Sequence, residues 1–137
     1  MAIRGGCLCG AVAFEIQGRI SPIQTCLCSR CRKASGSAFS AALLCAAKSF
    51  RWLRGQDGIA TFPLSTGFVS AFCRTCGSPL PLPATEGKVK AIPAGSLDGE
   101  LGTRIVQHIF VGSKADWFEL TDGLPQHDEA PPEARAR

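Results

Sequence analysis

The sequence predicts a mainly β domain: short strands with short helical turns, held together by metal-bound cysteines. Three observations lead to this fold class. Apolar residues make up 45% of the 137 residues, which is enough for the core of one domain. Val12, Phe14 and Ile16 alternate with other residues in the period-two pattern of a strand. The 15 glycines and 9 prolines divide the chain into short apolar runs, as in domains with many β turns.

The predicted strands follow one another with few helical signals between them. We expect strands at residues 12–17, 22–25, 39–47, 50–54, 59–64, 68–72, 88–92 and 103–111. One helical turn is predicted over residues 32–36, where Gly36 would stop it. We place a single domain at residues 1–124. A flexible C-terminal tail is expected at residues 125–137, where prolines and mixed charge replace the apolar pattern.

The composition narrows the possible function classes. The net charge of +4 is modest, and the basic residues are scattered rather than gathered in the stripe of a nucleic-acid-binding protein. The longest apolar stretch, residues 41–47, is too short to cross a bilayer, and residues 1–6 lack the apolar run of a signal peptide. We therefore expect a cytoplasmic protein with no nucleic-acid or membrane partner. In that reducing compartment, the eight cysteines are expected to be metal ligands rather than disulfides.

The motif Cys73-x-x-Cys76-Gly77 is the strongest single signal in the chain. Both sulfurs of such a turn can point to one metal ion, and Gly77 relieves the strain of the turn. A redox pair would instead be expected in a βαβ setting, which the sequence does not show. Cys7 and Cys9 can supply two further ligands and complete a structural zinc site, which we call the four-cysteine cluster. The alternatives are that Cys7 and Cys9 are free thiols, or that the metal is iron in a cluster.

The motif Cys26-x-Cys28-x-x-Cys31, which we call the three-cysteine loop, places three thiols close together. Three ligands leave the fourth position of a tetrahedral zinc open for water or a substrate thiol, so this loop is the candidate catalytic centre. Alternatively, Cys45 or His108 supplies a fourth ligand, or the site is empty in the isolated protein. The simpler interpretation of Cys45 is burial in the core. The simpler interpretation of His108 is a strand residue that faces solvent or is hydrogen-bonded.

Three basic residues adjoin the three-cysteine loop. Arg30, Arg32 and Lys33 could hold the carboxylates of a ligand, which arginine binds in a bidentate manner. They could equally form a solvated basic turn, and the two interpretations stay open at this point.

The cysteine motifs, in this order, resemble the glutathione-dependent formaldehyde-activating enzyme family. The resemblance lies in Gly6-Cys7-Leu8-Cys9-Gly10, then Cys26-x-Cys28-x-x-Cys31-Arg32-Lys33-x-Ser35-Gly36, then Phe72-Cys73-x-x-Cys76-Gly77-Ser78. The late segments His108-Ile109-Phe110-Val111, Trp117-Phe118 and Asp122-Gly123-Leu124-Pro125 are also similar to that family. Leu27 stands where many members carry a histidine.

The resemblance implies an Mss4-like fold that binds two zinc ions. The four-cysteine cluster (Cys7, Cys9, Cys73, Cys76) would hold a structural zinc, and the three-cysteine loop (Cys26, Cys28, Cys31) a second, labile one. It also implies a carbon–sulfur lyase type of enzyme with glutathione as co-substrate, acting on a glutathione adduct of formaldehyde or another small electrophile. A competing expectation is a non-catalytic zinc-stabilised β module that binds a small ligand, glutathione or a protein partner.

Overall fold

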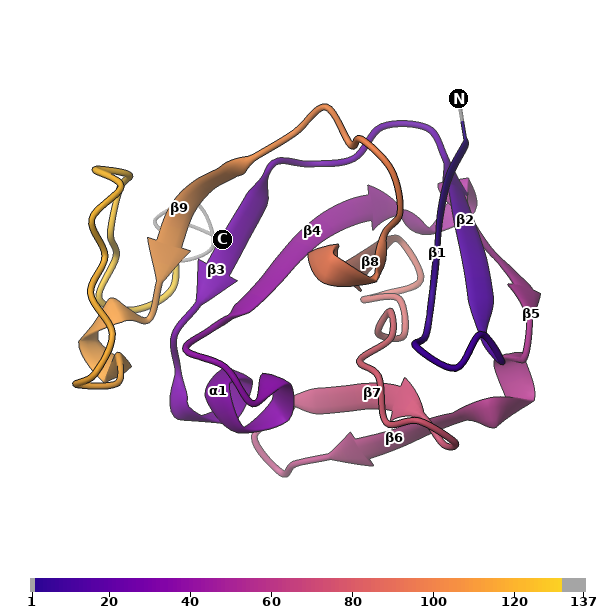
Figure 1. Ribbon diagram of the computed structural model, residues 1–137, viewed down its shortest axis with the longest axis horizontal. Coiled ribbons are helices and arrows are strands. Elements are labelled where there is room, and N and C mark those ends of the chain that lie inside the picture. Colours follow the sequence, from indigo (N-terminus) through magenta and orange to yellow (C-terminus); the bar gives the residue numbers. More distant parts are fainter. Residues whose placement is uncertain (1, 132–137) are drawn as a thin grey trace.

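The computed structural model describes residues 2–131, and its strands form three sheets (Figure 1). The first sheet is antiparallel with the order β1-β2-β5. Its strands are β1 (Ala2–Gly6), β2 (Ala13–Gln17) and β5 (Phe50–Arg54). Val12, Phe14 and Ile16 are all fully buried, as the period-two pattern predicts, but Ala13 and Glu15 between them are buried as well.

The second sheet has the order β8-β4-β3-β9. Its strands are β8 (Val89–Pro93), β4 (Ser40–Ala46), β3 (Ile23–Cys26) and β9 (Ile105–Ile109). β4 pairs antiparallel with both of its neighbours, whereas β3 and β9 run parallel. This parallel pairing brings the end of β3, where the three-cysteine loop begins, next to the end of β9.

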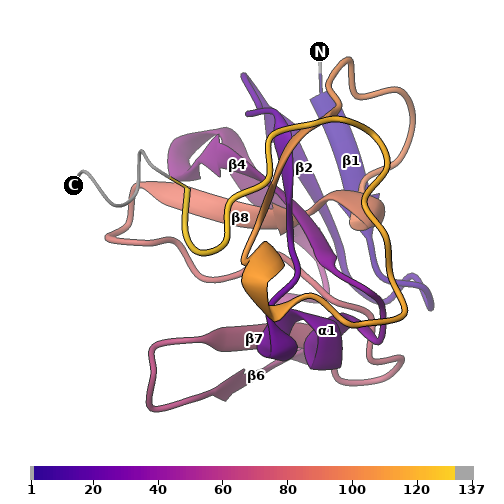
Figure 2. The ribbon, with the colours of Figure 1, turned by 90° about the vertical axis from the view of Figure 1, so that its left-hand side faces the viewer.

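The third sheet is a two-stranded hairpin of β6 (Ile59–Pro63) and β7 (Val69–Cys73). The helix α1 (Ser29–Ser35) lies beside this hairpin, as Figures 1 and 2 show. Within the described residues, four single-turn 3₁₀ helices follow strands: η1 (Ala47–Ser49), η2 (Gln56–Gly58), η3 (Ala94–Ser96) and η4 (Val111–Ser113). Within residues 2–131, no helix has the length and apolar character that crossing a membrane requires.

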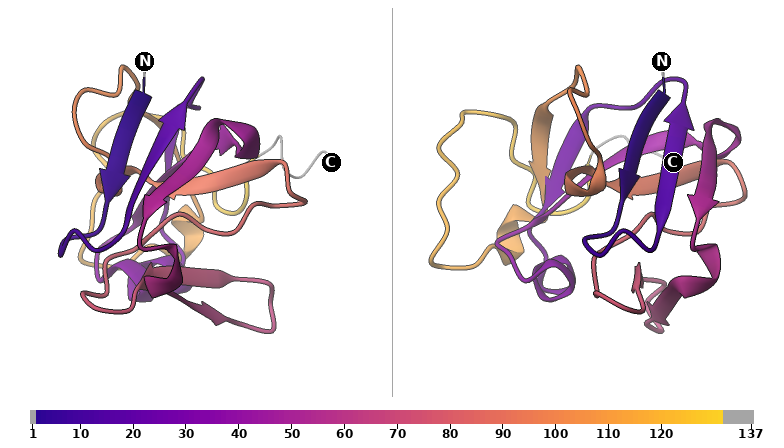
Figure 3. Two further views of the ribbon diagram at one scale, coloured as in Figure 1. Left: turned by 90° about the vertical axis from the view of Figure 1, so that its right-hand side faces the viewer. Right: turned by 45° about the vertical axis from the view of Figure 1, so that its right-hand side comes forward.

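The core is built from all three sheets. Figure 3 shows the first sheet standing against β4 and β8, with the β6–β7 hairpin below them. The ring of Phe14 stacks on Phe50 at 5.3 Å between centroids and meets Trp52 edge to face at 5.9 Å. Leu43 and Ile92 pack into the same cluster from β4 and β8. Because burial of apolar area is the main favourable contribution to folding, this cluster joins the sheets into one unit.

The prediction of a mainly β domain with short helical turns is confirmed, and the arrangement is consistent with the Mss4-like fold. Two local expectations differ. Helix α1 begins at Ser29 rather than near residue 32, because the side chain of Cys28 caps its first turn. Glu15, expected to alternate away from the apolar face of β2, is only 2% exposed. Its carboxylate pairs with Arg4 from β1 at 3.5 Å and Arg51 from β5 at 2.6 Å, which compensates the buried charge.

The segment after Leu124 runs beside β9. The N–H of His108 donates to the carbonyl of Pro125, and the N–H of His127 donates back to the carbonyl of His108, both at 2.9 Å. The N–H of Phe110 also donates to the carbonyl of Glu129 at 3.1 Å. The rest of the expected tail, residues 132–137, lies outside the described residues. The domain boundary at 124 stays a prediction.

Candidate metal centres

The four-cysteine cluster is assembled from two turns that lie far apart in the sequence. Cys7 and Cys9 follow β1, whereas Cys73 ends β7 and Cys76 lies in the turn after it. All four sulfur atoms lie within 4.8 Å of one another. The Cys9 sulfur is 3.6 Å from that of Cys7 and 3.8 Å from that of Cys73. Zinc–sulfur bonds of 2.3 Å in a tetrahedron put neighbouring sulfurs about 3.8 Å apart, so this donor set fits a zinc ion.

Backbone hydrogen bonds fix both turns of this cluster. In the second turn, the N–H of Gly77 donates to the carbonyl of Cys73 at 2.8 Å. Gly77 has a φ of 77°, a conformation that glycine adopts without steric cost. In the first turn, the N–H of Val12 donates to the sulfur of Cys7 at 3.3 Å. The N–H of Val12 orients the sulfur of Cys7 and stabilises the negative charge of its thiolate, which favours binding of a cation.

Ser78 links the two turns, a role that the sequence reasoning missed. Its hydroxyl accepts a hydrogen bond from the N–H of Leu8 at 2.9 Å and lies 3.2 Å from the sulfur of Cys76. Hydrogen bonds from the hydroxyl and the backbone of Ser78 lower the pKa of Cys76 to about 5. The only signal in the sequence is a hydroxyl residue two positions after the second cysteine of the turn.

The three-cysteine loop joins β3 to α1. Cys26 ends β3, Cys28 is the N-cap of α1, and Cys31 lies in the first turns of that helix. The sulfur of Cys28 accepts a hydrogen bond from the N–H of Cys31 at 3.3 Å. Leu27 is fully buried, and its N–H donates to the carbonyl of Ile109 at 3.0 Å. These contacts turn the chain so that the sulfurs of all three cysteines lie within 4.8 Å of one another.

The thiols of Cys26 and Cys31 have pKa values shifted in opposite directions. A hydrogen bond from Cys26 lowers the pKa of Cys31 to about 6, with a further hydrogen bond from Ser40 acting in the same direction. The same pairing with Cys31, together with burial, raises the pKa of Cys26. One thiolate therefore forms readily at this loop, and a bound cation would favour the thiolate form of its neighbours.

Neither alternative fourth ligand lies in the three-cysteine loop. Cys45 is buried in the core on β4, in register with Lys90 of β8. His108 is also buried, and both of its ring nitrogens are engaged. Its Nδ1 lies 2.5 Å from Oγ1 of Thr25, and its Nε2 lies 2.7 Å from Oδ2 of Asp122. Within residues 2–131, the loop therefore offers a metal ion three cysteine sulfurs and no fourth side-chain ligand.

The three basic residues near the loop occupy different environments. Arg32 is directed to the backbone, with Nε donating to the carbonyl of Leu27 at 3.4 Å and Nη2 to that of Ser113 at 3.3 Å. Arg30 lies over the ring of Phe68 at 5.9 Å, and its Nη1 donates to Thr66 at 2.9 Å. Lys33 is exposed on the helix surface. Arg30 and Lys33 therefore have the more accessible charges.

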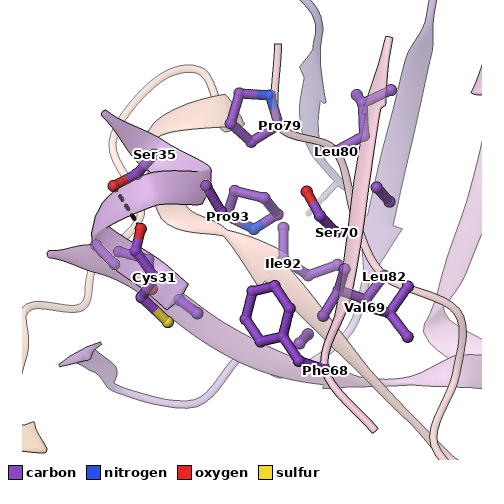
Figure 4. A pocket seen from close by; sticks show the side chains of 16 residues that line it. Cys31, Ser35, Phe68, Val69, Ser70, Pro79, Leu80, Leu82, Ile92 and Pro93 are labelled. Atoms are coloured by element: carbon purple, nitrogen blue, oxygen red, sulfur yellow. Dashed lines mark hydrogen bonds between the residues drawn. The ribbon is translucent and has the colours of Figure 1, made fainter. Parts of the chain in front are cut away.

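One hollow adjoins the three-cysteine loop, and a second hollow lies beside the first. The first is an apolar cavity of about 150 Å³, with Cys31 and Ser35 at one edge (Figure 4). The second is a larger hollow of about 740 Å³ that reaches Cys7, Ser78 and Asp98. Both share a wall formed by Ser35, Ser40, Ala41, Pro79 and Pro93. A ligand bound near Cys31 could therefore extend into either hollow.

Fold and sites together define a β domain with two cysteine clusters compatible with zinc. Residues 2–113 match a model of the family described as glutathione-dependent formaldehyde-activating enzyme, and the chain belongs to this family. It is also similar to a Rhodobacter sphaeroides protein whose crystal structure was determined in structural genomics. That similarity has a TM-score of 0.59 at 23% sequence identity, and it covers 74% of this chain and 98% of the other. At this identity, the similarity shows the fold alone.

Proposed function

We propose that this protein is a zinc-dependent enzyme of the carbon–sulfur lyase type, acting on a glutathione adduct of a small electrophile. The observation that carries the proposal is the position of Cys31. It belongs to a cluster of three thiols, and it also forms an edge of a cavity that a ligand can enter. Membership of the family supports glutathione as the thiol partner.

The two clusters would have different roles, one structural and one catalytic. Cys7, Cys9, Cys73 and Cys76 would hold a structural zinc, since four sulfurs complete its coordination. Cys26, Cys28 and Cys31 would hold the second ion, which would supply an open coordination position where the thiol of glutathione becomes a thiolate. The hydrogen bond from the N–H of Cys31 to the sulfur of Cys28 orients that sulfur toward the others.

Charged side chains would bind and orient the tripeptide. Glutathione has two carboxylates, and Arg30 and Lys33 are exposed cations on α1, within two residues of Cys31 in the sequence. Arg30 is held in place by Thr66 and the ring of Phe68, so little side-chain freedom remains for it to lose on binding. In the condensation direction, the glutathione sulfur bonds to the aldehyde carbon. The π electrons of the carbonyl move to oxygen, which takes up a proton as the thiol loses one.

The proposal can be tested by counting zinc and measuring glutathione binding in two cysteine variants. Cys31→Ala should keep one zinc per chain, lose the second, and lose the glutathione-dependent protection of that ion against a chelator. Cys45→Ala is the matched control, because it removes a buried core thiol that belongs to neither cluster. It should keep both ions. If Cys31→Ala retained two zinc ions and unchanged turnover of the glutathione adduct, the proposed reaction centre would be wrong.

A further inference from the structure

The cavity beside Cys31 is almost entirely apolar, which a one-carbon electrophile does not require. Its walls include Phe68 and Val69 at the start of β7, Leu80 and Leu82 from the segment after it, and Ile92 at the end of β8. Leu80 and Ile92 are fully buried, while Phe68 and Val69 are half-buried. Figure 4 shows these side chains gathered opposite Cys31 and Ser35, with Ser70 pointing into the space between them.

The size of the cavity identifies the group that would fill it. A volume of about 150 Å³ is that of engineered apolar cavities in protein cores that bind benzene. Formaldehyde would leave most of this space empty, and the atoms of the walls would lose dispersion contacts on that side. An aryl ring or a branched alkyl group of similar size would fill it and would bury the apolar surface of both partners.

We propose that the electrophile handled by this protein is an aldehyde with an apolar substituent about the size of a benzene ring, which binds in the Phe68–Ile92 cavity. This inference rests on the proposed function and specifies its substrate class. Cys31 lies at one edge of the cavity. The apolar substituent of an adduct can therefore occupy the cavity, with the reacting carbon near Cys31 and the tripeptide outside the cavity, where Arg30 and Lys33 on α1 would bind its carboxylates.

The reaction of such an aldehyde balances without an oxidant or reductant. The sulfur of glutathione forms a bond to the carbonyl carbon, and the carbon–oxygen π bond breaks. The thiol loses one proton, and the new alkoxide oxygen gains one. The product is a hemithioacetal, and the reverse reaction breaks the same carbon–sulfur bond. The substituent takes no part in the bond changes, so its recognition depends only on the cavity.

Stable thioethers allow this recognition to be measured as binding rather than as turnover. Isothermal titration calorimetry on the zinc-loaded protein would compare S-benzylglutathione with S-methylglutathione. Burial of part of a phenyl group in this partly open cavity predicts binding of the benzyl compound about 10-fold tighter than that of the methyl compound. Equal affinities would overturn the inference and leave the proposed function standing. If neither compound nor glutathione itself bound, the proposed function would fail as well.

Two variants on the β6–β7 hairpin test whether the preference for the benzyl over the methyl compound arises in this cavity. Ser70→Phe should fill the cavity and reduce the benzyl preference to less than about threefold, while binding of the methyl compound is retained. Thr61→Phe is the matched control, because Thr61 lies on the partner strand, is exposed and does not line the cavity. If Ser70→Phe does not fold, Phe68→Ala removes one wall and should weaken the preference instead. An unchanged preference in the folded cavity variant would overturn the assignment.

Discussion

Leu8 and Leu27 occupy the same place in two Cys-x-Cys motifs but meet opposite environments. Leu8 is 88% exposed, whereas Leu27 is fully buried between β3 and α1. Removing a fully buried leucine side chain costs about 2–5 kcal/mol, because transfer free energy is lost and a cavity remains. Leu27→Ala should therefore lower the free energy of unfolding by about 3 kcal/mol. For a chain of this length, that corresponds to a fall in Tm of about 10 °C.

Leu8→Ala makes the same chemical change in the other motif and serves as the control. Its effect should stay within about 0.5 kcal/mol, as is usual for exposed positions. Urea denaturation followed by circular dichroism, with saturating zinc in every sample, measures both values. Equal losses of stability in the two variants, or a loss below about 1 kcal/mol for Leu27→Ala, would refute the idea that this leucine anchors the three-cysteine loop from the core.

Two further variants and one pH series test other parts of the structure. Cys76→Ser should abolish cooperative thermal unfolding, because a structural zinc contributes about 10 kcal/mol or more, comparable with the whole stability of a domain; a transition within about 5 °C of wild type would contradict this. Cys28→Ser should lose the second zinc, measured by metal analysis, but unfold cooperatively, since serine is also a good N-cap for α1. The N–H of Leu124 and then His108 lower the pKa of Asp122. A carboxyl whose pKa is lower in the folded state than in the unfolded state stabilises the folded protein at a pH above its unfolded-state pKa of about 3.9. This contribution is lost as the pH falls through the folded-state pKa. Asp122→Asn should therefore be less stable than wild type at pH 6 in urea denaturation, with a difference that shrinks below about pH 4; a difference constant over that range would contradict the linkage.

Local sequence patterns were sufficient to predict most strands and the grouping of the three-cysteine loop. A period of two along β2 and the spacing of Cys26, Cys28 and Cys31 both depend on residues close together in the chain. The burial of Glu15 could not be predicted in this way. It depends on strand register, which places Arg4 and Arg51 directly opposite Glu15 on the two flanking strands. The ligand roles of the cysteines themselves stay predictions.

The contacts of the buried His108 also depend on strand register, which the local sequence does not predict. Its sequence neighbours favoured an ordinary strand position over a metal ligand, but they did not indicate which groups the ring contacts. The parallel pairing of β3 with β9 sets His108 opposite Thr25, one residue before Cys26. The ring thereby joins the strand that leads into the three-cysteine loop to Asp122, in the segment beyond β9. Only the register of two strands that are distant in sequence shows that this histidine contacts the strand leading into the three-cysteine loop.

The segment between β7 and β8 shows why the apolar cavity could not be predicted from single residues. Its prolines at 79, 81 and 83 indicated only that no central strand continues there. The leucines between them use their N–H groups in opposite directions: Leu80 donates to the carbonyl of Ala71 on β7 at 2.9 Å, and Leu82 to that of Ala91 on β8 at 3.0 Å. Proline has no N–H, so Leu80 and Leu82 supply the backbone donors of residues 79–83, and both donors have a partner. The segment thus joins two sheets, and its Leu80 and Leu82 line the cavity together with Phe68 and Ile92.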